Sequence, residues 1–284
     1  MTGKRVFVFD SGVGGLPYLE ALRLRIPGIP CHFVADRAGF PYGRKTRAEV
    51  RSLVLDRVER IAGRFSPHLV VLACNTASQA ALESARTRFP GISFVGTVPA
   101  VKPAAESTRT GTIVVLSTER AAVDPYLDTL VERWAQGVRV LRVGAQDLVE
   151  FVERDFLDAS EAERLAACRA ALDPVLDSGA DRIVLACTHF LHVADYIARA
   201  AGPGVRIVDS RAGVARRAAE VLSEVSASSP AGSAGSVPTG SVPALGSGVA
   251  GEEHGGLYAT GEAGSWTGLD RFAELFGLSF EGAL

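Results

Sequence analysis

The stretch Val70-Val71-Leu72-Ala73-Cys74-Asn75-Thr76-Ala77-Ser78 decides the fold. Its apolar run ends at a cysteine, small polar residues follow, and residues 79–85 have helix-forming composition. The pattern predicts a strand, a turn that carries a thiol, and a helix. A second copy follows 113 positions later (187 − 74) as Ile183-Val184-Leu185-Ala186-Cys187-Thr188-His189. Two copies of a thiol-bearing turn predict two related halves whose thiols face each other.

The composition is that of a globular protein with one large core or two medium ones. The 284 residues are 47% hydrophobic and 22% charged. A net charge of −2 favours neither nucleic acid nor an anionic membrane as a partner. No apolar run reaches the ~18 residues that a membrane-spanning helix needs, and the apolar run before Asp10 is too short for a signal peptide. We therefore expect a cytoplasmic location.

Short apolar runs alternate with segments of helical pattern along the chain. This alternation is typical of parallel α/β units. The fold class we predict is α/β, with two pseudo-symmetric parallel-sheet domains and the active site in the cleft between them. The predicted helices span residues 16–24, 46–65, 120–134, 161–178 with a kink at Pro174, 191–201, 211–225 and 269–276.

The predicted domain boundaries follow changes in composition. A break at Val98-Pro99-Ala100-Val101-Lys102-Pro103 separates a first domain (residues 1–97 plus 210–284) from a second one (residues 98–209). The first domain carries Asp10 and Cys74, and the second carries Cys187 and His189. Residues 226–256 are dominated by Ser, Gly, Ala and Pro, which predicts a disordered insertion.

Two further loops have compositions that suit a ligand site. Asp10-Ser11-Gly12-Val13-Gly14-Gly15 follows a predicted strand, where open α/β sheets bind ligands, and its glycines let backbone amides approach a ligand. The alternative is a glycine-rich turn with a helix-capping serine. It is neither a dinucleotide fingerprint nor a Walker loop. Phe40-Pro41-Tyr42-Gly43 is a turn in which Tyr42 stands between Pro and Gly. The Tyr42 side chain lines either a pocket or the rim of the core.

The chemistry of the four cysteines depends on their local setting. Cys31 and Cys168 read as buried core residues, and no Cys-x-x-Cys pair indicates a zinc knuckle or a redox dithiol. Cys74 and Cys187 each close a strand and open a helix, where the helix N-terminus lowers a thiol pKa. Acid/base groups on opposite faces of one carbon are what a stereoinversion requires.

Two other combinations remain open at this point. Cys187 and His189 form a possible nucleophile and base, although they are only two residues apart on a turn. His189 and His192 have helical spacing and form a possible zinc site with a cysteine, but no third ligand of suitable spacing is visible.

Several motifs in order carry a family resemblance. They are Phe9-Asp10-Ser11-Gly12-Val13-Gly14-Gly15-Leu16, Pro41-Tyr42-Gly43, Ala73-Cys74-Asn75-Thr76-Ala77-Ser78, Cys187-Thr188-His189-Phe190 and the ending Tyr258-Ala259-Thr260-Gly261-Glu262. With them the chain resembles the glutamate racemases of the cofactor-independent aspartate/glutamate racemase superfamily. The resemblance covers nearly everything except residues 226–256.

The resemblance implies an activity and a setting for it. It implies a glutamate site buried between two α/β domains and interconversion of L- and D-glutamate by two thiols, without cofactor or metal. It also implies a homodimer and a supply of D-glutamate for peptidoglycan synthesis. Two alternatives remain: a racemase of another acidic amino acid such as aspartate, and a catalytically silent amino-acid-binding regulatory protein of the same fold.

The resemblance also assigns roles to residues. Cys74 would deprotonate D-glutamate and Cys187 L-glutamate, with Asp10 and His189 assisting the respective thiols and Glu153 as a further acidic helper. The substrate-binding positions are Asp10, Ser11, Pro41, Tyr42, Gly43, Asn75, Thr76, Thr188 and His189. The chain departs from the family pattern at Ala186, Leu191 and Ala121, where the family usually has Gly, Pro and often Thr. None of these departures removes a thiol.

Overall fold

The protein is described by a computed structural model that covers residues 3–227, 255–262, 266 and 268–284. The insertion predicted at 226–256 lies almost entirely outside the described residues. At its two ends, residues 226–227 finish helix α10 (Arg211–Ala227) and residue 256 begins strand β9 (Gly256–Ala259).

Two parallel sheets form the framework of the molecule. The first has the order β10-β9-β2-β1-β3-β4 and the second the order β6-β5-β7-β8. Every described strand pair is parallel, as predicted. The strands are β1 (Val6–Asp10), β2 (Cys31–Ala35), β3 (Leu69–Leu72), β4 (Ser93–Gly96), β5 (Thr112–Ser117), β6 (Arg139–Gly144), β7 (Arg182–Leu185), β8 (Arg206–Val208), β9 and β10 (Ser279–Ala283).

The two sheets repeat one strand order. The segment β2-β1-β3-β4 of the first sheet and the whole second sheet, β6-β5-β7-β8, both place their strands in the sequence second, first, third, fourth. Cys74 follows β3 and Cys187 follows β7, so each thiol turn occupies the equivalent place in its half. The predicted pseudo-symmetry is therefore present in the topology.

Helices cover both faces of the first sheet. On β1, Phe7 and Phe9 belong to the core cluster formed with α2 (Arg47–Phe65) and α3 (Asn75–Arg88). The alternate residues Val6 and Val8 belong to the cluster on the other face, where α1 (Leu16–Arg25) packs against α10. Alternation along a strand sends successive side chains to opposite faces. Thr46 caps α2 through a capping box with Glu49.

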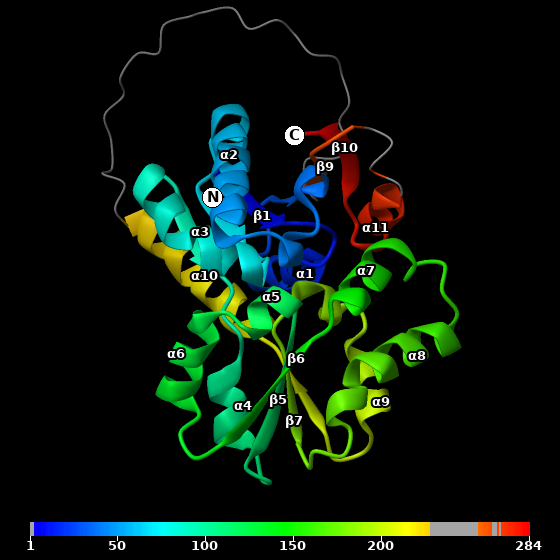
Figure 1. Ribbon diagram of the computed structural model, residues 1–284. Coiled ribbons are helices and arrows are strands. Elements are labelled where there is room, and N and C mark those ends of the chain that lie inside the picture. The colour runs from blue at the N-terminus through cyan, green and yellow to red at the C-terminus, as the bar shows by residue number, and fades with distance from the viewer. Residues whose placement is uncertain (1–2, 228–254, 263–265, 267) are drawn as a thin grey trace, which may run out of the picture.

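The second sheet is covered in the same way (Figure 1). Helices α4 (Val101–Ser107) and α6 (Pro125–Trp134) lie on one face, and α8 (Glu161–Leu172) and α9 (Ala194–Ala201) on the other. The short α5 (Glu119–Ala122) and α7 (Gln146–Arg154) lie at the end of the sheet that faces the first half. One core cluster contains residues of both halves, so the halves pack directly on each other.

Several predicted helices have different bounds. The helix predicted over 161–178 ends at Leu172 and continues as a 3₁₀ turn, η3 (Asp173–Val175), because Pro174 supplies no backbone N–H. The helix predicted through residue 134 is two helices, and Asp124 caps the second with Pro125 at its first position. Helix α4 and strand β10 were not predicted. The last helix is α11 (Leu269–Leu275).

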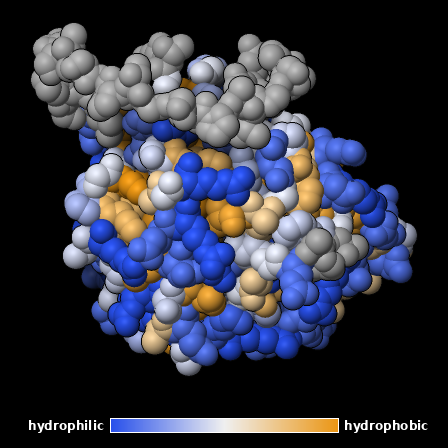
Figure 2. All heavy atoms as spheres, turned by 90° about the horizontal axis from the view of Figure 1, so that it is seen from above, coloured by the Kyte–Doolittle hydropathy of each residue, from blue (hydrophilic) through white to orange (hydrophobic). Residues whose placement is uncertain are grey.

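The surface mixes polar and apolar residues. In the view of Figure 2, hydrophilic atoms surround smaller apolar patches on the visible face. Within the described parts of the chain, no helix has both the length and the apolar character needed to cross a membrane.

Candidate active site

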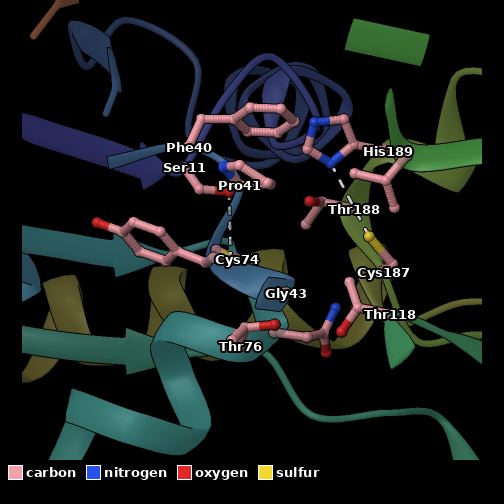
Figure 3. A pocket seen from close by; sticks show the side chains of 13 residues that line it. Ser11, Phe40, Pro41, Gly43, Cys74, Thr76, Thr118, Cys187, Thr188 and His189 are labelled. Atoms are coloured by element: carbon pink, nitrogen blue, oxygen red, sulfur yellow. Dashed lines mark hydrogen bonds between the residues drawn. The ribbon is translucent and has the colours of Figure 1, made fainter. Parts of the chain in front are cut away.

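A cavity between the two halves contains both thiols. About 300 Å³ of space in and around this cavity is free of protein atoms, and part of that space is open to solvent. Figure 3 shows Cys74 beside Ser11 and Cys187 beside His189, so each thiol has a different polar side chain next to it. The lining residues are Ser11, Phe40, Pro41, Tyr42, Gly43, Cys74, Asn75, Thr76, Thr118, Val149, Cys187, Thr188 and His189.

The Cys74 turn has the predicted strand–turn–helix form. Cys74 is the N-cap residue of the 14-residue helix α3 and lies two residues after the end of β3. Its Sγ atom lies 3.7 Å from the Ser11 hydroxyl. Burial is the main cause that raises the pKa of the Cys74 thiol well above its ordinary value, and the negative charge of Asp10 is the second. The Ala77 backbone N–H opposes this rise. The pKa lowering predicted from the helix N-terminus is therefore wrong for Cys74, because desolvation outweighs it.

The Cys187 turn differs from the prediction. It opens a four-residue 3₁₀ helix, η4 (Thr188–Leu191), and α9 begins only at Ala194 rather than at 191. A single 3₁₀ turn aligns few peptide dipoles. The N-terminus of η4 therefore stabilises a negative charge much less than the N-terminus of a long α-helix does. The polar partner of the Cys187 Sγ is instead the imidazole of His189, whose Nδ1 lies 3.9 Å away.

His189 joins Cys187 to Glu153. The His189 Nε2 atom lies 2.7 Å from a carboxylate oxygen of Glu153, on helix α7, and both side chains are buried. A proton on Nε2 that is donated to Glu153 leaves Nδ1 directed at the thiol. Burial lowers the pKa of His189, but the hydrogen bond and charge of Cys187, with the charge of Asp10, raise it to a net value above the ordinary one.

The Asp10 carboxylate connects the first half of the molecule to the second through a hydrogen bond. This carboxylate is wholly buried, accepts the Gly12 backbone N–H at 2.9 Å and accepts the Thr188 hydroxyl at 2.9 Å. Burial raises the pKa of Asp10, while the charge of His189 and these hydrogen bonds oppose the rise. Asp10 and Glu153 thus lie behind the cavity lining, each in contact with a lining residue.

Two glycines of the first loop allow close packing of the second half of the molecule against the loop backbone. The sequence pattern alone predicts instead that they allow a ligand to approach. A Cβ atom on Gly14 would lie 2.5 Å from both His189 Nδ1 and Thr188 Oγ1. A Cβ atom on Gly12 would overlap the Glu153 carboxylate. These two positions need glycine because the second half packs against the loop backbone.

Tyr42 and Gly43 line the cavity next to a buried polar network. The Tyr42 hydroxyl donates to Asp36 at 2.6 Å, and Asp36 also accepts from Arg57 at 2.9 Å. The Tyr42 ring belongs to the core between α2 and α3, so both readings of this turn hold at once.

Asn75 has unused hydrogen-bonding capacity. Both polar atoms of its buried amide lack a partner among the described residues, and the side chain lines the cavity. A buried amide without partners is costly unless a ligand or water engages it. Asn75 is therefore ready to bind a polar ligand in the cavity.

Sequence reasoning missed three lining residues: Phe40, Thr118 and Val149. Thr118 follows β5 as Ser11 follows β1, so the repeat itself contained the signal for this hydroxyl. The Phe40 ring lies 5.8 Å from the His189 ring, a contact that depends on how the halves pack.

The other histidine and the other two cysteines considered from the sequence, His192, Cys31 and Cys168, lie in packed surroundings. His192 donates from Nε2 to the Val13 carbonyl at 3.0 Å and contacts the rings of Phe272 and Phe276. Cys31 and Cys168 are free, buried thiols whose pKa burial raises to about 12. Across the described residues, no group of three or more His, Cys, Asp and Glu side chains is placed to hold a metal ion.

Comparison with known proteins gives consistent matches. Residues 20–218 match the Asp/Glu/hydantoin racemase family. The chain is 40% identical to the glutamate racemase of Roseiflexus sp. strain RS-1 over 223 residues, which are 78% of this chain and 81% of that protein. It is 42% identical to the glutamate racemase of Sphingopyxis alaskensis over 218 residues, 76% and 81% of the two chains.

A crystal structure of Escherichia coli glutamate racemase, in complex with L-glutamate and the activator UDP-MurNAc-Ala, has a similar fold. The TM-score is 0.82 at 29% sequence identity, and the match covers 99% of this chain and 97% of that one.

Proposed function

The chain belongs to the Asp/Glu/hydantoin racemase family, and from this premise we infer that it is a glutamate racemase that interconverts L- and D-glutamate without a cofactor. The observation that carries this conclusion is a single cavity lined by two thiols from equivalent turns of the two halves. The polar atoms around the cavity suit an amino acid with two carboxylates.

The proposed reaction transfers two protons at one carbon. With L-glutamate bound, the Cys187 thiolate accepts the Cα proton, and the Cα–H electron pair remains on the substrate as a carbanion. The Cys74 thiol then donates its proton to the opposite face, which gives D-glutamate, a Cys187 thiol and a Cys74 thiolate. The reverse reaction uses the same steps in the opposite order. The raised pKa of Cys74 supports its start as the proton donor.

The carbanion needs stabilisation, because no cofactor absorbs its charge in this proposal. Donors around the cavity include the Asn75 amide and the hydroxyls of Thr76 and Thr118. The Thr188 hydroxyl donates to Asp10, so its oxygen is left to accept a hydrogen bond. Fixed donors in a site that excludes water stabilise developing charge more strongly than water does. We assign Asn75 and the threonines to the substrate carboxylates and ammonium, together with Ser11, Pro41, Tyr42 and Gly43.

Each thiol has its own assistant in this proposal. Asp10 lies beside Ser11 and carries the charge that most affects Cys74, so it serves the Cys74 side. His189, backed by Glu153, serves the Cys187 side. Neither assistant needs to move between the halves during the reaction.

We also propose the division into residues 1–97 plus 210–284 and residues 98–209, with closure of the two domains around the substrate. Support comes from the sheets, because β1–β4, β9 and β10 fall in the first range and β5–β8 in the second. Small-angle scattering tests it: the radius of gyration is expected to fall when glutamate is added. An unchanged value at saturating glutamate would contradict closure.

A homodimer, a cytoplasmic location and a supply of D-glutamate to peptidoglycan are further parts of the proposal that rest on the family resemblance. Analytical ultracentrifugation tests the first and cell fractionation the second. Rescue of a bacterial strain that requires D-glutamate tests the third.

The activity is tested with purified protein and each glutamate enantiomer, with aspartate as the competing substrate. We expect optical rotation to decay to zero from either enantiomer of glutamate, with a kcat/KM well above that for aspartate. A higher kcat/KM for aspartate would change the substrate. Calorimetric binding of glutamate without turnover would replace catalysis by ligand binding.

A further inference from the structure

Arg37 stands directly behind the histidine of the Cys187 side. It begins the 3₁₀ turn η1 (Arg37–Gly39), just after β2, and therefore belongs to the first half. Its guanidinium forms an ion pair with Glu153, which belongs to the second half. The side chain of Arg37 is only 15% exposed and that of Glu153 only 1%. Because water has little access to this pair, the neighbouring protein groups determine its geometry.

Glu153 uses both carboxylate oxygens. Oε2 accepts the Val13 backbone N–H at 3.1 Å and lies 2.7 Å from His189 Nε2. Oε1 accepts from Arg37. The carboxylate therefore has three partners in a fixed arrangement, and the loss of one leaves buried charge uncompensated.

The contacts form a continuous path from Arg37 to the thiol. Arg37 contacts Glu153, Glu153 contacts His189, and His189 Nδ1 lies 3.9 Å from the Cys187 Sγ. An arginine holds a carboxylate in a defined orientation because its guanidinium is planar and always charged. The orientation of Glu153 in turn sets which imidazole nitrogen carries the proton and where the ring points.

We propose that Arg37 is a positioning residue for proton transfer at Cys187, acting through Glu153 on His189 and leaving the Cys74 side unaffected. The inference rests on the proposed racemase function for its kinetic part and on the geometry alone for its effect on His189.

The charged groups around His189 give the proposal a measurable sign. They are Asp10 from β1, Arg37 from η1, Glu153 from α7, and Cys187 and His192 from its own segment. Arg37 lowers the pKa of His189, against the larger raising effects of Cys187 and Asp10. Removal of the Arg37 charge therefore moves the His189 titration to higher pH.

Arg44 offers a matched control, because its partner is a second glutamate of helix α7. It pairs with Glu150 at 2.6 Å, also from the first half to α7, one turn before Glu153. The Arg44 side chain is 57% exposed, and its ion pair with Glu150 is separate from the contacts that lead through His189. Arg44→Met thus removes an arginine–glutamate contact between the halves without disturbing that path.

The first test is an NMR titration of the His189 imidazole in wild type, Arg37→Met and Arg44→Met, assigned with a His189→Gln variant. It needs no catalytic turnover. We expect the midpoint to rise in Arg37→Met and to stay in place in Arg44→Met. Equal midpoints in wild type and Arg37→Met would overturn the inference. If Arg37→Met does not fold, Arg37→Gln takes its place with the same expected direction.

The second test is kinetic. Because the two enantiomers are equally stable in solution, kcat/KM must fall equally in both directions, by about tenfold or more for a misplaced catalytic group. The asymmetry appears in primary deuterium isotope effects on kcat/KM. In Arg37→Met the effect with 2-deuterated L-glutamate should rise and that with 2-deuterated D-glutamate should fall. Arg37→Lys keeps the positive charge but lacks the planar guanidinium, so it should restore the wild-type ratio only in part.

The outcomes separate the two claims. An active wild type with unchanged isotope effects and an unmoved titration in Arg37→Met refutes the role of Arg37 alone. A wild type that racemises no amino acid refutes the proposed function, while the NMR titration still decides whether Arg37 acts on His189.

Discussion

The two thiol turns occupy equivalent places and have unequal surroundings. Cys74 and Cys187 each follow the third strand of the same strand order. Cys74 caps a 14-residue α-helix beside a serine, in surroundings that raise its pKa. Cys187 opens a single 3₁₀ turn and contacts a histidine that is joined to a buried carboxylate and arginine.

The difference teaches that a repeated backbone does not repeat its proton chemistry. A racemase of this design needs one sulfur to accept a proton while the other holds one. A desolvated thiol keeps its proton, and a thiol beside an imidazole has a partner that can take it. In our proposal the inequality of the two turns sets the resting state, with Cys74 protonated.

Removal of either thiol has the largest expected effect. Cys74→Ala and Cys187→Ala should each lower racemisation by about 10³-fold or more, because one face of Cα loses its acid or base. Each variant should still exchange the Cα proton of one enantiomer with solvent: L-glutamate in Cys74→Ala and D-glutamate in Cys187→Ala. Polarimetry and proton NMR in D₂O measure the two processes. A variant that keeps a tenth of the wild-type rate would break the comparison.

Substitution of the two assisting residues, Asp10 and His189, should affect proton transfer at different thiols. Asp10→Asn and His189→Gln are each expected to lower kcat/KM by about 10²-fold, the usual contribution of a positioned acid or base. Asp10→Asn should increase the deuterium isotope effect for D-glutamate, and His189→Gln that for L-glutamate. If both variants shift the two isotope effects alike, the assignment of one assistant to each thiol is wrong.

The contact between the halves should tolerate no side chain at Gly14. Gly14→Ala would place a methyl group 2.5 Å from His189 and Thr188 atoms, so we expect a loss of about 1–3 kcal/mol in the free energy of unfolding and about tenfold in activity. Gly63→Ala is the control, because nothing lies within 4 Å of its added Cβ in helix α2. Denaturant unfolding of both variants measures the difference, and equal stabilities would contradict the packing argument.

The other two thiols should have the smallest effect on catalysis. Each half contains one cysteine away from the cavity, Cys31 in the first and Cys168 in the second, both fully packed. Cys31→Ala and Cys168→Ala should leave kcat/KM unchanged and cost about 1 kcal/mol of unfolding free energy each. Thiol labelling at neutral pH should spare both in the folded wild type. A fall in kcat/KM would show that the site extends further than the cavity.

Much of this architecture follows from local pattern. The alternation of strands and helices, the capping box at Thr46 and the paired thiol turns depend on neighbours in sequence, so they could be predicted. Strand β10 could not, because Ser279–Ala283 has little strand preference and is placed by pairing with β9. The helix after Cys187 was predicted too early, because the pattern does not distinguish a 3₁₀ turn from the start of an α-helix.

The site was harder to predict where the halves meet. Thr118 could have been found by extending the repeat from Ser11 to the end of β5. Phe40 and Arg37 could not, because their contacts with His189 and Glu153 arise only when η1 packs against α7 and η4. Sequence spacing predicts contacts between the repeated strand–turn units, but it does not predict contacts made by the loops outside them.

The most direct test of the central claim follows the Cα hydrogen during a single conversion in D₂O. With wild-type protein and L-glutamate, two opposed thiols predict that D-glutamate carries deuterium at Cα from its first appearance, while unconverted L-glutamate keeps hydrogen. The same result, with the enantiomers reversed, is expected from D-glutamate. Deuterium in the unconverted substrate as early as in the product would indicate one base that works on both faces, and would contradict the account.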